Sequence, residues 1–221
     1  MNFMIRYFML VIVFVVIACK QDKKYHDVAK KEMLVSQIDA IQDILDYQKT
    51  LNEEFKDPET SPLPDRYRKD FEGLDFFEPD TTYIINAKFV RTPEALPFSM
   101  PTTTNRKSIE LVYGIAYFTF NGVQQQLEIY QNQELMLQGE YKDYLFLPFT
   151  DLTNGEETYG GGRYIDMSIP KEEDKIVINF NRAYNPYCTY NKKYSCPIVP
   201  RVNHLNAKIL AGVKAFNKDK K

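Results

Sequence analysis

The sequence contains no tryptophan, only two histidines and three cysteines, and no excess of basic over acidic residues. Its 28 lysines and arginines against 30 aspartates and glutamates give a formal net charge of −2. Nucleic acid binding rests on neutralising phosphates with basic side chains, so we expect no nucleic acid partner. Of the two histidines, His26 lies in a polar stretch near the N-terminus, and His204 alone remains for the expected domain. No Ser-His-Asp arrangement is visible, and we expect His204 to be structural rather than catalytic.

Long apolar runs are also missing, apart from one near the N-terminus. Phe8 to Ala18 are apolar without a break and follow the positive charge of Arg6. This run is shorter than the roughly 20 residues that cross a bilayer, and it has the length of a signal-peptide core. It ends in a short motif that resembles the lipobox of bacterial lipoproteins, Val16-Ile17-Ala18-Cys19.

The lipobox resemblance implies that residues 1–18 are a cleaved signal peptide and that Cys19 carries the lipid, palmitate included. Residues 19–26 are then a lipidated polar tether. We expect a protein of the bacterial cell envelope, held to a membrane on its extracytoplasmic side, at the periplasmic face or the cell surface. The alternatives are an uncleaved signal anchor or a secretory signal followed by a chance cysteine.

The remaining chain, residues 27–221, is expected to form a single globular domain. Residues 27–56 are predicted to be helical, and Asp57-Pro58 ends the pattern because proline disfavours helix in the residue before it. We expect the helix to pack one apolar stripe on the body of the domain. A coiled coil is the alternative, although the stripe covers few heptads. The stripe consists of Leu34, Ile38, Ile41 and Leu45.

Sixteen tyrosines and fifteen phenylalanines supply the bulky packing, and aromatic residues favour pleated, half-buried surfaces. Residues 82–212 are therefore predicted to be a β-rich body, with a long proline-containing loop over residues 92–107. The fold class that follows is mainly β or α+β, with the N-terminal helix packed on an antiparallel β-sandwich or a partly open β-barrel. Strands are expected near residues 82–90, 108–120, 123–131, 144–149, 163–169, 175–181 and 205–211.

Two hairpins are predicted. Asn121-Gly122 lies between alternating runs, as a two-residue type I′ turn requires, so Phe120 pairs with Val123 and the register continues to Gly114 and Ile129. The outer face of this hairpin holds tyrosines and polar residues. Either the N-terminal helix covers it or it binds a ligand. Matching apolar faces predicts the second hairpin, between residues 163–169 and 175–181, with Asp166 opposite Asn179.

The densest polar motifs lie between residues 146 and 205. They are Glu157-Thr158-Tyr159, Arg163-Tyr164-Ile165-Asp166, Phe180-Asn181-Arg182-Ala183-Tyr184-Asn185-Pro186, Cys188, Cys196-Pro197 and Asn203. Together they resemble an uncharacterised bacterial family, domain of unknown function family 1684, with weaker matches earlier in the mature chain. That family usually has aspartate where Asn179 stands and arginine where His204 stands. It also usually has Gly-Glu where Gly212-Val213 stands. The family has no established activity, so the resemblance implies identity and not function.

The same motifs predict a polar pocket. Asp151, Asp166 and Glu157 are candidate acid/base groups, and Arg163 after three glycines (Gly160 to Gly162) could hold an anion with exposed amides. The alternatives are a tight glycine connector and a network of buried polar residues that fixes loops. The predicted ligand-binding residues are Arg163, Tyr164, Asp166, Asn179, Asn181, Arg182, Tyr184 and Asn185.

Cys188 and Cys196 lie eight residues apart, and an extracytoplasmic location favours a disulfide between them. On the entropy model, the cross-link is worth about 2.6 kcal/mol. Free thiols and a metal site with His204 are the alternatives. The metal site lacks an evident fourth ligand, so we expect no metal and no cofactor.

Three functions remain open at this level. The first is an envelope lipoprotein that binds a small polar or anionic ligand in the polar pocket. The second is a hydrolase-like enzyme that uses Asp166 or Glu157 with Arg163. The third is a structural interaction lipoprotein that uses its N-terminal helix.

Overall fold

The computed structural model describes residues 22–216, and side chains from residue 36 onward. The predicted signal peptide and Cys19 lie outside the described residues. Contacts divide the described chain into two compact units, one up to residue 38 and one from residue 39 onward. Among residues 22–216, no helix combines the length and the apolar character that crossing a bilayer requires.

Helix α1 (Asp22–Lys56) begins five residues before the predicted start, so the last part of the predicted tether is helical. Within the second unit, α1 buries a stripe of Ile44, Leu51 and Phe55. Leu45 belongs to the predicted stripe and is 43% exposed, whereas its neighbour Ile44 is fully buried. The predicted stripe is therefore wrong at Leu45 and at Ile38, which is 65% exposed, whereas Ile41 is half-buried. The side chain of Leu34 lies outside those that the structure describes. The buried residues recur at a helical spacing, as the predicted ones do. The ring of Phe55 packs edge-on against the ring of Tyr190.

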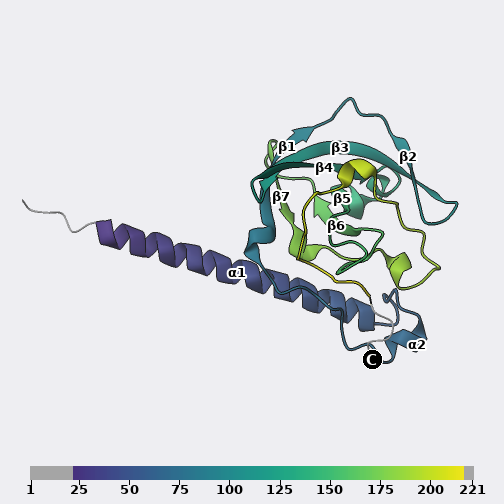
Figure 1. Ribbon diagram of the computed structural model, residues 1–221. Helices are drawn as coiled ribbons and strands as arrows, with labels where there is room; N and C mark the ends of the chain where they lie inside the picture. The colour runs from purple at the N-terminus through teal and green to yellow at the C-terminus, as the bar shows by residue number, and fades with distance from the viewer. Residues whose placement is uncertain (1–21, 217–221) are drawn as a thin grey trace, which may run out of the picture. The chain divides into compact units, whose positions relative to one another are not determined.

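The body is one antiparallel sheet with the strand order β6-β5-β4-β3-β1-β7, and β2 pairs with β3. The sheet curls into a half-barrel (Figure 1). The predicted fold class, mainly β with an N-terminal helix and a partly open barrel, is confirmed. Main-core residues such as Ala116, Leu127 and Ile178 lie on the inner face of the curl. The elements are α2 (Asp65–Arg68), β1 (Ile84–Arg91), β2 (Phe98–Pro101), β3 (Lys107–Phe120), β4 (Val123–Asn132), β5 (Tyr144–Phe149), β6 (Arg163–Ser168) and β7 (Lys175–Asn179).

The β3–β4 hairpin has the predicted register. Phe120 pairs with Val123, and the pairing continues to Gly114 and Ile129. Asn121 and Gly122 have φ angles of 49° and 78°, the left-handed conformation that a type I′ turn needs. On the outer face, the ring of Phe98 in β2 lies 6.0 Å from the fully buried Tyr130. Part of this face is thus covered by β2.

The predicted β6–β7 hairpin is wrong. β6 pairs with β5, with Asp166 opposite Phe146, and β7 pairs with β1, with Asn179 opposite Ile84. Matching the apolar faces of two strands does not identify them as neighbours, because every strand of a curled sheet alternates apolar and polar residues in the same way. Residues 98–101, predicted to be loop, form β2, and the predicted strand at 205–211 is not one. β6 and β7 are instead the two edges of the sheet, joined by residues 169–174.

Candidate functional site

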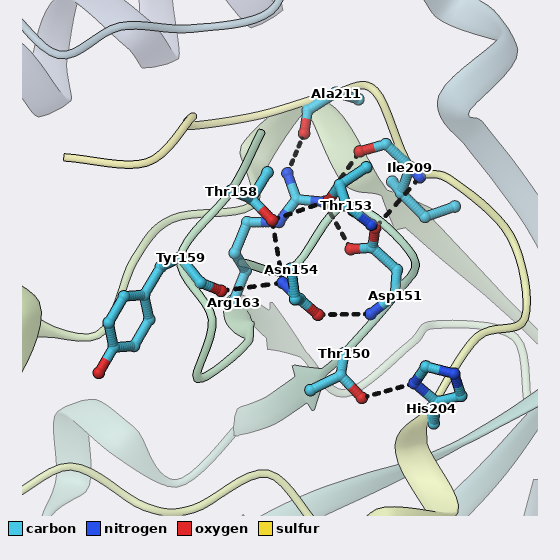
Figure 2. Close-up of polar contacts among 10 residues, drawn as sticks. All are labelled: Thr150, Asp151, Thr153, Asn154, Thr158, Tyr159, Arg163, His204, Ile209 and Ala211. Atoms are coloured by element: carbon cyan, nitrogen blue, oxygen red, sulfur yellow. Dashed lines mark hydrogen bonds and ion pairs between the residues drawn. The ribbon is translucent and has the colours of Figure 1, made fainter. Parts of the chain in front are cut away.

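Arg163 begins strand β6 and is completely buried. Its Nη2 donates to Oδ2 of Asp151 at 2.8 Å and to the carbonyl oxygen of Ile209 at 2.9 Å. Its Nη1 donates to the carbonyl oxygen of Ala211 (Figure 2). Burial lowers the pKa of Arg163, and the adjacent carboxylate of Asp151 counteracts this shift. The guanidinium therefore joins β6 to the loop after β5 and to the C-terminal segment, and it has no surface left for a ligand.

The loop around Asp151 is closed by its own polar side chains (Figure 2). Oδ1 of Asp151 accepts hydrogen bonds from the backbone N–H and the hydroxyl of Thr153, at 2.8 and 2.6 Å. The hydroxyls of Thr153 and Thr158 lie 2.7 Å apart, and Asn154 donates to Thr158 at 2.9 Å. We call Asp151, Thr153, Asn154, Thr158 and Arg163 the Arg163 network. It corresponds to the predicted alternative of buried polar residues that fix a loop.

The triple glycine contributes a tight turn to the same region. Gly162 has a φ angle of +91°, and a Cβ atom there would lie 2.6 Å from the carbonyl oxygen of Phe149. The N–H of Gly162 already donates to the carbonyl of Tyr159 at 3.1 Å. Glycine is thus required at Gly162 by backbone conformation and close approach. The expectation that Arg163 and these amides together hold an anion loses its basis.

Other predicted residues also serve as internal ties. Asn181 is buried, accepts from the N–H of Asp80 at 3.0 Å and donates to its carbonyl at 2.8 Å. Asn185 is buried and donates to the carbonyl of Lys214 at 2.9 Å. The hydroxyl of Tyr164 donates to the carbonyl of Pro197. These side chains connect segments that lie far apart in the sequence and do not face an open site.

Glu157 lies elsewhere and is half-buried. Its carboxylate pairs with Lys208 at 2.9 Å, and this hydrogen bond lowers the pKa of Glu157. Arg163 is committed to Asp151, so the structure does not bring Glu157 and Arg163 together as a catalytic pair.

Asp166, unlike the buried Arg163, is open to solvent. Its side chain is exposed to solvent, and its Oδ1 accepts hydrogen bonds from the hydroxyls of Tyr144 at 2.8 Å and Tyr184 at 2.7 Å. The surrounding protein displaces part of the hydration of this carboxyl and raises its pKa, while the two phenol hydrogen bonds counteract part of the rise. Oδ2 accepts no hydrogen bond from any residue that the structure describes.

Asp166 lies in an open cleft of about 820 Å³ between the two sheet edges. Two cations that line it are paired: Arg182 binds Asp43 through two bonds of 2.9 and 3.0 Å, and Lys175 binds Glu172 at 2.8 Å. Within residues 36–216, no cation is paired with Asp166. We call this the Asp166 cleft, and its lining includes Asp43, Asn86, Tyr144, Asp166, Ser168, Lys171, Lys175, Val177, Asn179 and Arg182.

Four of the predicted binding residues belong to this region, but the sequence did not predict the arrangement that brings them together. Asp166, Asn179 and Arg182 line the cleft, and Tyr184 donates to Asp166. Tyr144 and Asp43 were missed. Tyr144 sits opposite Ser168 in the β5–β6 register. Matching the apolar residues of these two strands to each other would have predicted this register. Asp43 gave no local signal, because its role depends on where α1 packs.

Cys188 and Cys196 are neighbours, and both are free thiols in this structure. The N–H of Cys188 donates to Sγ of Cys196 at 3.1 Å. The hydrogen bond between the side chains lowers the pKa of Cys188 to about 6. The disulfide stays a prediction, which thiol titration of denatured, unreduced protein tests. His204 contacts Thr150 at 3.0 Å, and among the described residues no group of three or more His, Cys, Asp or Glu side chains is placed to hold a metal ion.

Comparisons with known proteins give a family without a known activity. Residues 69–214 match the family described as "Protein of unknown function (DUF1684)". A similar solved structure is the NMR structure of the uncharacterized protein from gene locus rrnAC0354 of Haloarcula marismortui. It is 28% identical, has a TM-score of 0.61, and the match covers 84% of this chain and 96% of that one. No curated protein matches. Since this relative is archaeal and the family match begins after Cys19, bacterial origin and the lipid anchor stay predictions.

Proposed function

We propose that this chain, which belongs to the DUF1684 family of proteins of unknown function, is a membrane-anchored binding protein that holds a polar ligand in the Asp166 cleft. One observation carries the proposal. Asp166 is held by two tyrosine hydroxyls in an open cleft, and no cation among the side chains of residues 36–216 pairs with it. A fixed carboxylate with a free oxygen is suited to receive a ligand's hydrogen-bond donors.

The charges of the cleft define the ligand class. Arg182 and Lys175 already have carboxylate partners, and Arg163 is buried outside the cleft. Lys171 also lines the cleft, but it lies beyond the end of β6, five residues after Asp166. A ligand with a positive charge or several hydroxyl or amide donors gains the charge-assisted bonds that Asp166 offers. An anion would instead meet an unpaired carboxylate. The proposed ligand is therefore cationic or donor-rich, a change from the anion that the sequence suggested.

The anchor in this proposal rests on the sequence. The apolar run from Phe8 to Ala18 and the motif ending in Cys19 support lipid attachment at an extracytoplasmic membrane face. In a bacterial host fed radiolabelled palmitate, the wild type should take up label and fractionate with membranes. Cys19→Ala should lose both properties. Normal processing and membrane retention of Cys19→Ala would exclude the lipid anchor.

A ligand-shift melting screen tests the cleft. The probes are diamines, amino sugars and neutral sugars, and the proteins are the wild type, Asp166→Asn and Glu140→Gln. Glu140 is exposed and does not line the cleft, so its variant controls for loss of one negative charge. A true ligand at one hundred times its Kd should raise Tm by about 5–10 °C. Asp166→Asn should lose that rise and Glu140→Gln should keep it. Equal shifts in all three proteins would remove Asp166 from the site.

A second candidate function, acid/base catalysis, is favoured by the raised pKa of Asp166. A carboxyl with a raised pKa stays protonated to a higher pH and can donate that proton to a bound substrate. Neither Glu157 nor Arg163 lines the cleft, so Asp166 is the candidate acid. Any ligand from the melting screen should be followed for turnover by mass spectrometry. Its slow conversion by the wild type, and none by Asp166→Asn, would establish an enzyme.

A further inference from the structure

Both edges of the curled sheet face the Asp166 cleft, and each has main-chain groups available for pairing. On β6, the N–H of Tyr164 donates to the carbonyl of Tyr184, and the N–H of Tyr184 donates back, both at 2.9 Å. These bonds point away from β5, where Pro148 opposite Tyr164 has no N–H to offer. Successive outward groups follow at every second residue of a strand. The N–H and C=O groups of Asp166 and Ser168 therefore also point away from β5.

The β7 edge follows the same logic. The N–H of Phe89 donates to the carbonyl of Asp174 at 2.8 Å, which fixes the alternation along the β1–β7 pair. Main-chain groups of Ile176 and Ile178 then point toward β1, and those of Lys175, Val177 and Asn179 point away. Val177 is 53% exposed. Within the described part of the chain, no hydrogen bond joins the outward main-chain groups of Asp166, Ser168 or Val177 to another residue.

At Tyr164, the outer edge of β6 is already paired with another segment of this chain, through the bridge to Tyr184. This bridge is the first hydrogen-bonded position, or rung, that a strand added to β6 would have. The chain then turns away through the 3₁₀ helix Phe180–Arg182, so the next two rungs at Asp166 and Ser168 stay open. Exposed strand edges are the usual sites where an extended peptide adds to a sheet. A strand that continues this ladder antiparallel to β6 would exchange both hydrogen bonds with Asp166, since Asp166 is two residues beyond Tyr164.

Side-chain geometry adds a charge requirement. Directly opposite residues in an antiparallel pair have their side chains on the same face, with Cβ atoms about 4.5–5.5 Å apart. A residue opposite Asp166 would therefore meet its carboxylate, which has no cationic partner among the described side chains. Charge complementarity favours lysine or arginine at that position.

We propose that the Asp166 cleft binds an extended peptide segment, which adds as an antiparallel strand to β6 with a basic side chain opposite Asp166. This inference rests on the proposed function of the cleft and names its ligand class. Main-chain hydrogen bonds to Asp166 and Ser168 provide affinity, and the carboxylate provides selectivity for the basic residue.

Isothermal titration calorimetry on the full chain tests this with three peptides and one amine. The first peptide is a capped seven-residue segment in which threonine and valine alternate around a central lysine. The second has glutamate in place of the lysine. The third keeps the lysine but carries N-methyl groups on the central residue and the residues two positions away, which blocks strand pairing on that edge. The amine n-butylamine carries the charge without a peptide backbone.

Strand addition predicts that the lysine peptide binds at least tenfold more tightly than the glutamate peptide and the methylated peptide. In Ser168→Pro, affinity for the lysine peptide should fall by a similar factor. Proline there removes an N–H that does not pair with β5, so the β5–β6 pairing survives, and the melting temperature checks the fold.

Equal binding of the methylated and unmethylated lysine peptides would overturn strand addition and leave Asp166 as a charge site. Binding of n-butylamine that Asp166→Asn abolishes, without binding of any peptide, would overturn the peptide proposal alone. Absence of binding by all four probes, with no hit in the melting screen, would overturn both proposals.

Discussion

Arg163 and Asp166, the central residues of the Arg163 network and the Asp166 cleft, lie three residues apart on strand β6 and have opposite properties. Arg163 is completely buried, and its bonds to Asp151, Ile209 and Ala211 tie the loop after β5 and the C-terminal segment to the strand. Asp166 is exposed, held by two tyrosines, and has no cationic partner among the described residues. Strand geometry explains the difference, because residues separated by an odd number point to opposite faces. Two charged residues that look adjacent in a motif can therefore serve stability and binding separately.

The largest expected effect is on the buried side of this comparison. Arg163→Met leaves Asp151 as a buried charge without its partner and should lower the free energy of unfolding by about 3–5 kcal/mol. Urea denaturation measures this. Adding Asp151→Asn to Arg163→Met removes the uncompensated charge and should recover part of the loss. A cost below about 1 kcal/mol for Arg163→Met would show that the network is not a structural tie.

An intermediate effect is expected at the glycine turn next to the Arg163 network. Gly162→Ala forces a left-handed φ angle on alanine and brings Cβ to 2.6 Å from the carbonyl oxygen of Phe149. The expected loss is about 2 kcal/mol, in the range for strained backbone positions. Gly160→Ala is the matched control, because its Cβ would come no closer than 3.7 Å to another atom and its φ angle is not left-handed. Similar stabilities for the two variants would contradict a specific requirement at Gly162.

The smallest effect on stability is expected at the cleft. Asp166→Asn should change the free energy of unfolding by no more than about 0.5 kcal/mol, as for other exposed positions. The pKa of Asp166 is raised in the folded state, so the folded protein binds this proton more tightly than the unfolded chain. Its contribution to stability is present below the unfolded pKa and is lost as pH rises through the folded pKa. The stability of the wild type relative to Asp166→Asn should therefore decline over this pH range, which cancels the contributions of the other carboxyls, such as Glu110.

Carboxyl NMR titration sharpens the same point. Tyr144→Phe or Tyr184→Phe removes a hydrogen bond that favours the charged carboxylate, so each variant should raise the pKa of Asp166 further. An unchanged or lower pKa in both variants would show that the phenols do not hold the carboxylate.

Predictions from local signals were the reliable ones. The Asn121-Gly122 turn fixed the β3–β4 register because a two-residue loop leaves no freedom in pairing. The β6–β7 pairing failed because an apolar alternation specifies which face is buried and leaves the partner strand open. The prediction that Arg163 and Asp166 share one pocket was wrong. The sequence already argued against it, because residues three apart on the predicted strand point to opposite faces. The partners of Asn181 and Asn185, Asp80 and Lys214, lie too far away in sequence to be found from a motif.

The sequence by itself determined the β-rich fold class, the helix that ends at Lys56, the central hairpin and the family, because turns, alternation and motif residues act over short distances. The tertiary structure decided which strands became edges, which face of β6 was sealed, and that Arg163 was buried while Asp166 remained open. Those outcomes depend on how the sheet curls and on where distant loops return. Burial and pairing are properties of the packed whole, and a side chain's neighbours across the fold set them.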